Sequence, residues 1–258
     1  MRARLLTFAA ILAVLMPLRA SAGQVTVAAA SDLSFALPEL AAGFEKQSGH
    51  MLRVSYGSSG NFFSQIQNGA PFDLYFSADA DYPRKLEAAG LTEPGSFYVY
   101  AVGRIVLWVP KDSPLDLEHA GMQVLLDPRV RRIAIANPRH APYGRAAVAA
   151  MKSAGVYEKI ADKLVLGENI SQAAQFVASG NADVGILALS LAVVSALSGQ
   201  GRYWEIPADS YPRLEQALVI LKSAPDPRPA RAFLTYLKTP AAAAILRRYG
   251  FQIPEVKP

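Results

Sequence analysis

The segment Leu52-Arg53-Val54-Ser55-Tyr56-Gly57-Ser58-Ser59-Gly60-Asn61 places a β-branched run directly before a turn rich in glycine and serine. A periodic apolar pattern follows the turn and stops at Gly69, as a helix does at a residue able to adopt positive φ. Similar junctions, where Ser, Asn or Gly precedes a helix, recur at residues 28–31, 136–144 and 168–171. Strands that alternate with helices predict crossover units and a mostly parallel sheet with helices on both faces.

The rest of the chain continues this alternation. Short β-branched runs predict strands at residues 25–29, 52–56, 73–77, 105–109, 133–136, 184–187 and 218–221. Glycines that follow periodic apolar runs predict helix C-termini at Gly49, Gly69, Gly155, Gly180 and Gly250. In the first helix an apolar stripe begins at Leu33, and Pro38 inside it predicts a kink or a restarted helix.

The length of the chain favours two lobes, because residues 23–258 are too many for one open sheet of this kind. We expect the chain to leave the first lobe near residues 100–104 and to return near residues 213–218. The first lobe would then comprise residues 23–102 and 214–258, and the second lobe residues 103–213. The two crossings would form a hinge beside a cleft.

Composition and the N-terminus indicate a folded, exported protein. Of the 258 residues 52% are hydrophobic, 18% are charged and none is cysteine, which excludes disorder and a disulfide or thiolate-metal scaffold. Residues 1–22 are typical of a secretory signal with cleavage after Ala22, and their apolar run is too short to span a membrane. Cleavage leaves 23 basic and 21 acidic residues, so nothing favours nucleic acid as a partner. We expect a periplasmic monomer.

Enzyme signatures are missing from the sequence. The histidines, His50, His119 and His140, form no helical metal-binding pair and are expected on the surface. The turn after residue 56 departs from the nucleophile elbow G-x-S-x-G, because Asn61 stands where the motif requires glycine. No phosphate-binding loop of the form G-x-x-x-x-G-K-[ST] occurs either. We therefore expect no enzyme, no cofactor and no metal-cation site.

The strand-to-helix junctions indicate an anion site instead. The first N–H groups of a helix have no partner within it and carry part of the positive end of the helix dipole. Several such ends at one cleft bind an anion, and in α/β folds they meet at the carboxyl ends of the strands. Any single junction is also ordinary capping chemistry. Ser58-Ser59-Gly60 exceeds the needs of a cap, because it adds two hydroxyls and a glycine that permits close backbone approach.

The sequence resembles the periplasmic molybdate-binding proteins that serve ABC importers. The matching stretches are Val27-Ala28-Ala29-Ala30-Ser31, Tyr56-Gly57-Ser58-Ser59-Gly60, Gly69-Ala70-Pro71-Phe72-Asp73-Leu74, Phe76-Ser77-Ala78-Asp79, Ala136-Asn137-Pro138, Ala141-Pro142-Tyr143-Gly144 and Arg248-Tyr249-Gly250-Phe251. The resemblance implies a type II binding-protein fold, with two α/β lobes joined by two crossover strands around a ligand cleft. It implies molybdate or tungstate as ligand and a membrane permease as partner.

The resemblance also assigns the site. It implies that Ser31 and Ser59 are hydroxyl donors of the first lobe, and that Tyr143 and Ile170 donate backbone N–H groups from the second lobe. Ser58 and Asn61 would be neighbours of the ligand. A site of fixed donors disfavours protonated oxyanions such as phosphate, because their own protons would be buried without a partner.

Two positions depart from the family pattern. Some members have a tyrosine where this chain has Ala188, so Tyr143 is expected to supply that hydroxyl. Asp32 follows Ser31, and a carboxylate aimed at a dianion would repel it. We expect the helix dipole to hold Asp32 without its facing the ligand; an Asp32 that faces the cleft would indicate a different ligand. The alternatives are an exported enzyme acting on a phosphorylated or sulfated substrate, and a sensor that uses the same cleft for another anion such as sulfate.

Overall fold

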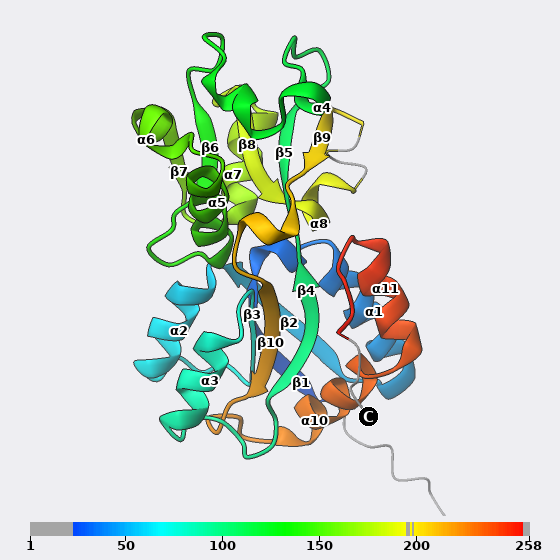
Figure 1. Cartoon of the computed structure of the whole chain (residues 1–258). Helices are drawn as coiled ribbons and strands as arrows, with labels where there is room; N and C mark the ends of the chain where they lie inside the picture. The colour runs from blue at the N-terminus through cyan, green and yellow to red at the C-terminus, as the bar shows by residue number, and fades with distance from the viewer. Residues whose placement is uncertain (1–22, 195–196, 198, 255–258) are drawn as a thin grey trace, which may run out of the picture.

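The computed structural model describes residues 23–194, 197 and 199–254 and has two α/β halves stacked end to end (Figure 1). The first half is built on a sheet of order β2-β1-β3-β10-β4. Its strands are β1 (Gln24–Ala30), β2 (Met51–Gly57), β3 (Leu74–Ser77), β4 (Tyr98–Gly103) and β10 (Leu214–Ile220). β10 runs antiparallel to both of its neighbours, and the other four strands share one direction.

Helices cover both faces of this first sheet (Figure 1). One face packs against α1 (Ala36–Ser48), α10 (Pro227–Leu237) and α11 (Pro240–Arg248), and the other against α2 (Ser59–Gln67) and α3 (Asp81–Ala88). Side chains alternate between the faces along β1: Val27 belongs to the core below α1, whereas Ala28 packs towards α2. Apart from its edge strand β2, the first sheet is therefore a buried central layer.

The second half repeats this arrangement with strand order β7-β6-β8-β5-β9. Its strands are β5 (Ile105–Pro110), β6 (Ile133–Ala136), β7 (Leu164–Gly167), β8 (Val184–Ala188) and β9 (Gly201–Glu205). Its helices are α4 (Leu117–Ala120), α5 (Pro142–Ser153), α6 (Tyr157–Ile160), α7 (Ile170–Ala178) and α8 (Leu189–Ala192). Short 3-10 turns occur in both halves: η1 (Ser31–Leu33) follows β1 in the first half, whereas η2 (Gly121–Leu126), η3 (Ala161–Lys163) and η4 (Ala208–Ser210) lie between β5 and β10.

The chain crosses between the halves twice, at Arg104 between β4 and β5 and at residues 206–213 between β9 and β10. The predicted two-lobed α/β fold is confirmed. We keep the boundaries proposed from the sequence, 23–102 with 214–258 for the first lobe and 103–213 for the second. The proposed secretory signal, residues 1–22, lies outside the described residues. Within the part that the structure describes, no helix has the length and apolarity of a membrane span.

The seven predicted strands are all present, and β4, β7 and β9 were missed. β9 is an edge strand with three exposed residues, Arg202, Tyr203 and Glu205, so its sequence lacks an apolar run. β7 is also an edge strand, and its apolar run is only three residues long. The predicted glycine stops are confirmed: Gly49, Gly69, Gly155, Gly180 and Gly250 all have positive φ. The break near Pro38 is confirmed as well, because the helical segment begins as η1 and restarts at Ala36.

Candidate functional site: an anion cavity between the lobes

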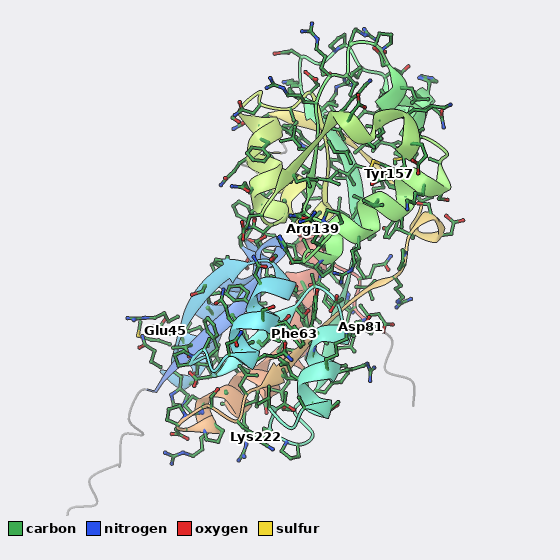
Figure 2. All side chains as sticks on the ribbon, turned by 90° about the vertical axis from the view of Figure 1, so that its left-hand side faces the viewer. Glu45, Phe63, Asp81, Arg139, Tyr157 and Lys222 are labelled. Carbon is green, nitrogen blue, oxygen red and sulfur yellow. The ribbon has the colours of Figure 1, made fainter. Side chains whose placement is uncertain are left out.

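Direct hydrogen bonds join the two lobes on the side where the strands of both sheets end. Gly60 N–H donates to the carbonyl of His140 at 2.8 Å, and Ser171 Oγ donates to the carbonyl of Ser31 at 2.9 Å. Figure 2 shows the lobes in contact at this level, with Arg139 at the junction. A Cβ on residue 60 would lie 2.6 Å from the His140 carbonyl oxygen, so the approach requires glycine.

A small cavity lies at this junction. It is lined by residues of five strand-to-helix junctions: Ala30, Ser31, Asp32, Gly57, Ser58, Ser59, Ala78, Ala141, Pro142, Tyr143 and Ile170. Its volume of about 10 Å³ is the room of one water molecule. A tetrahedral oxyanion is larger, so the lobes must part slightly to admit it. The four predicted principal residues, Ser31, Ser59, Tyr143 and Ile170, are all brought together here.

Ser59 is the first residue of α2 and is fully buried. Its Oγ accepts the Ala78 N–H at 2.9 Å, which leaves the hydroxyl proton for another acceptor. Tyr75 fixes the same turn, because its hydroxyl donates to the Ser59 carbonyl at 2.7 Å. A hydroxyl oriented in this way, at the start of a helix, is suited to donate to an anion.

Ser31 is held by the second lobe. Its Oγ donates to Asn169 Oδ1 at 3.1 Å and accepts the Ser171 N–H at 3.3 Å. Asn169 is also the N-cap of α7, because its Oδ1 accepts the Gln172 N–H at 3.1 Å. Ile170 follows as the first residue of α7, so its N–H has no partner within the helix.

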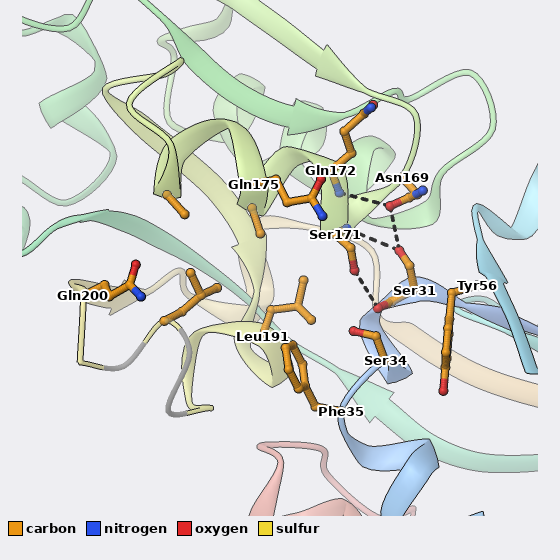
Figure 3. Close-up of a pocket in the computed structure, with 13 residues that line it drawn as sticks. Ser31, Ser34, Phe35, Tyr56, Asn169, Ser171, Gln172, Gln175, Leu191 and Gln200 are labelled. Carbon is orange, nitrogen blue, oxygen red and sulfur yellow. Dashed lines mark hydrogen bonds between the residues drawn. The ribbon is translucent and has the colours of Figure 1, made fainter.

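Ser31 also borders a larger groove of about 580 Å³ between the lobes (Figure 3). The groove is lined by hydroxyl, amide and apolar side chains, including Tyr56, Gln172, Gln175 and Gln200, and none of its lining side chains is charged at neutral pH. In Figure 3 the hydrogen bonds of Ser31 to Asn169 and Ser171 stand at the edge of this groove. The sequence indicated Asn169 only as an ordinary helix cap, and it did not indicate Asn169 or Ser171 as a partner of Ser31.

Tyr143 contributes differently from the expectation. Its phenol donates to Asp32 Oδ2 at 3.0 Å and accepts from Gln216 Nε2 at 3.0 Å. The hydroxyl proton is therefore given to Asp32, and the group that Tyr143 offers to a ligand is its backbone N–H near the start of α5. Ala188 ends β8, is buried and does not line the cavity.

Asp32 lies at the cavity, although it was expected to be held by the helix dipole without facing the ligand. Asp32 is 1% exposed and lines the cavity. Its Oδ2 accepts from Tyr143 and, at 2.6 Å, from Gln216 Nε2. Burial raises the pKa of Asp32 to about 7, and the hydrogen bonds from Gln216 and Tyr143 counter only part of this increase. The η1 turn that carries Asp32 packs against α7 and α8 of the second lobe.

Of the secondary candidates Ser58 and Asn61, only Ser58 lines the cavity. Ser58 lines the cavity, and its Oγ lies 2.9 Å from His140 Nδ1. Asn61 does not line it, because its amide donates to Glu168 Oε1 at 2.6 Å in a neighbouring groove. The structure thus joins a serine and a histidine that are 82 positions apart, a pair the sequence did not reveal. Among the described residues, no carboxylate bonds the ring of His140, so the pair lacks the third member of a catalytic triad.

The expectation of surface histidines holds for His119, whose side chain is 86% exposed. The other two are only partly exposed: His140 is half-buried between the lobes, and His50 is half-buried and accepts the Gly23 N–H at 2.9 Å. Across the described ranges, no group of three or more His, Cys, Asp or Glu residues could hold a metal ion. The cavity therefore offers hydrogen-bond donors at helix starts, one buried carboxyl and no cationic side chain.

Two α/β lobes that close over a donor-lined cavity define a solute-binding protein, which holds its ligand where the lobes meet. The chain belongs to the family of bacterial extracellular solute-binding proteins, whose model matches residues 25–252.

Relatives with a stated ligand are similar over nearly the whole chain. The molybdate-binding protein ModA of Azotobacter vinelandii is 41% identical over 237 residues, covering 92% of this chain and 93% of that protein. ModA of Rhodobacter capsulatus is 40% identical over 236 residues, covering 92% and 91%. The solved structure of the periplasmic molybdate-binding protein of Azotobacter vinelandii superposes with a TM-score of 0.84 at 37% identity, covering 90% of this chain and all of that one.

Proposed function

We propose that this protein captures molybdate, or tungstate, between its lobes and delivers it unchanged to the permease of an ABC importer. The observation that carries the proposal is the convergence of Ser31, Ser59, Tyr143 and Ile170 on one cavity without a cationic side chain. Helix-start N–H groups and hydroxyls bind an oxyanion by charge-assisted hydrogen bonds. The 40–41% identity to ModA proteins over nearly the whole chain supports molybdate as the oxyanion.

The setting of the protein belongs to the same proposal. We infer that residues 1–22 direct export and are removed after Ala22, and that the mature protein acts as a monomer in the periplasm. The partners are the oxyanion and the membrane permease, with no cofactor and no nucleic acid. The family description as extracellular and the periplasmic relative support this location.

Thermal unfolding tests the ligand. Molybdate at 100 times its dissociation constant stabilises by about 2.7 kcal/mol, which raises the midpoint by roughly 5–11 °C for a protein of this size. Sulfate and phosphate are the comparison anions. A rise with sulfate alone would replace molybdate as the assigned ligand, and no rise with any oxyanion would contradict the anion site.

Serine variants test the cavity. Hydrogen bonds to charged groups contribute about 1.5–3 kcal/mol, so Ser59→Ala should weaken molybdate binding by roughly 10- to 100-fold in calorimetry. Ser31→Ala should weaken it as well. Ser223→Ala is the matched control, because its Oγ bonds the Phe72 carbonyl on the first lobe, away from the cavity. Undiminished binding by the Ser31→Ala/Ser59→Ala double variant would exclude this site.

One observation favours a second candidate ligand. Asp32 Oδ1 is buried and has no hydrogen-bond partner among the described residues, and an ionised carboxylate there would accept the proton of hydrogen phosphate. This modifies the expectation that protonated oxyanions are excluded. A midpoint rise with phosphate but not with molybdate would select this candidate. The relatives are binding proteins, so the enzyme alternative gains nothing from the comparisons.

A further inference from the structure

Asp32 has two differently occupied carboxyl oxygens. Oδ2 accepts two hydrogen bonds, from the Tyr143 phenol at 3.0 Å and from Gln216 Nε2 at 2.6 Å. Oδ1 is fully buried and has no partner within the part of the chain that the structure describes. Because Oδ2 already receives two donors, a proton on this carboxyl belongs on Oδ1, where it would point a new O–H group at its surroundings.

Hydrogen bonds from neighbouring residues fix the orientation of the Asp32 carboxyl. The Tyr100 hydroxyl donates to Gln216 Oε1 at 2.7 Å, which turns the amide so that Nε2 faces Asp32. Ser190 Oγ donates to the Asp32 carbonyl at 2.8 Å and holds the backbone of the η1 turn. The residue is thus anchored by both lobes, with Tyr143 and Ser190 from the second and Gln216 from the first.

No cation neutralises Asp32 within the described residues. The elements packed most closely against η1 are α7, α8 and β2, and neither α7 nor α8 contains a titratable residue. The titratable groups in its hydrogen-bond network are the phenols of Tyr143 and Tyr100, whose pKa values burial raises well above the ordinary value. The remaining charged or titratable residues on β2, α5, β4 and β10 are Arg53, Tyr56, Arg145, Lys152, Tyr98 and Glu215.

None of these residues reaches the carboxyl. Arg53 and Lys152 are exposed, and Arg145 pairs with Asp79. Burial raises the pKa of Asp32 to about 7, so the group changes charge near neutral pH. An ionised Asp32 beside a dianion would add like-charge repulsion in a site of low dielectric, whereas a neutral carboxylic acid adds a donor.

We propose that Asp32 holds the oxyanion as a neutral carboxylic acid, donating its Oδ1–H to a ligand oxygen, so that capture of a dianion by the protein with an ionised Asp32 takes up one proton from solvent. This inference rests on the proposed function. Asp32 then determines specificity, because it completes a site of donors for a fully ionised oxyanion. Hydrogen phosphate brings its own proton to the same position and would bind without proton uptake.

Calorimetry of the mature wild-type protein with sodium molybdate counts the proton. At about pH 8 the free carboxyl is ionised, and titrations in Hepes and in Tris, which differ in ionisation enthalpy, should show uptake of about one proton per molybdate. The dissociation constant should rise about tenfold per pH unit above the pKa of Asp32. Asp32→Asn keeps an N–H donor, and its binding should be independent of pH with uptake near zero.

Asp79→Asn is the matched control, because Asp79 is the other carboxyl at the lobe junction whose pKa burial raises. This variant should keep the uptake of about one proton. Tight molybdate binding by the wild type without proton uptake would overturn the inference and leave the proposed function standing. Absence of molybdate binding would overturn both. Should Asp32→Asn not fold, the wild-type proton count alone decides.

Discussion

At the scale of the residue, burial of Asp32 makes stability depend on pH. The pKa of this carboxyl is about 7 in the folded chain against an ordinary 3.8, so the folded state binds the extra proton between these values. Stability from this group therefore falls as pH rises from about 4 to 7. Between pH 5 and 8 the wild type should lose about 2–3 kcal/mol through Asp32, measured by denaturant unfolding.

Asp32→Asn should remove this loss, because the amide has no charge to bury. Asp209→Asn, at an exposed position, is the control and should keep the pH dependence of the wild type. Equal pH dependence in wild type and Asp32→Asn would show that the carboxyl is hydrated or paired in solution.

At the scale of the element, substitutions at two glycines should distinguish contact between the lobes from the stability of a helix end. In Gly60→Ala the new Cβ would lie 2.6 Å from the His140 carbonyl oxygen and 2.7 Å from Tyr82 Oη, so α2 could not meet the second lobe. We expect molybdate affinity to fall more than tenfold in calorimetry while the unfolding midpoint changes little, because Gly60 does not adopt positive φ.

Gly49→Ala should do the reverse. Gly49 has φ of 74° after α1, and a Cβ added there would meet no other atom within 4 Å. Its replacement should cost about 1 kcal/mol of stability and leave affinity unchanged. Loss of affinity in Gly49→Ala alone would contradict the role assigned to Gly60.

The elements also show what the sequence could predict. Periodicity and glycine stops located seven of the ten strands and the ends of α1, α2, α5, α7 and α11, because these signals are local. The surroundings of Asp32 could not be predicted, because its partners Tyr143, Ser190 and Gln216 are more than 100 positions away. The pairing of Ser58 with His140 could not be predicted for the same reason, because the two residues come from different lobes and meet only when the lobes are in contact.

At the scale of the whole molecule, Arg145 joins the lobes. Its guanidinium pairs with Asp79 and lies 5.4 Å from the centre of the Tyr82 ring. The Arg145 side chain is 42% exposed, so the pair contributes at most about 1 kcal/mol. Arg145→Ala should weaken molybdate binding by about two- to fivefold, in calorimetry, by favouring the open form.

Arg129→Ala is the control for this variant, because Arg129 pairs with Asp127 within the second lobe. It should leave the affinity unchanged. Small-angle scattering of the ligand-free Arg145→Ala variant should give a larger radius of gyration than the wild type, and equal radii would exclude this ion pair as a contributor to closure.

The position of β10 affects the order in which the chain can fold. β10 lies between β3 and β4, and β4 has no other strand beside it in the first sheet. The second lobe is one continuous stretch of chain. The first sheet is complete only when residues 214–220 have been made, and the sheet face that packs against α1 is covered only when α10 and α11 have followed. During synthesis from the N-terminus, the segment made first is thus completed last. A growing chain shorter than about 220 residues therefore has an unfinished first sheet, because β4 gains its neighbour only when β10 has been made.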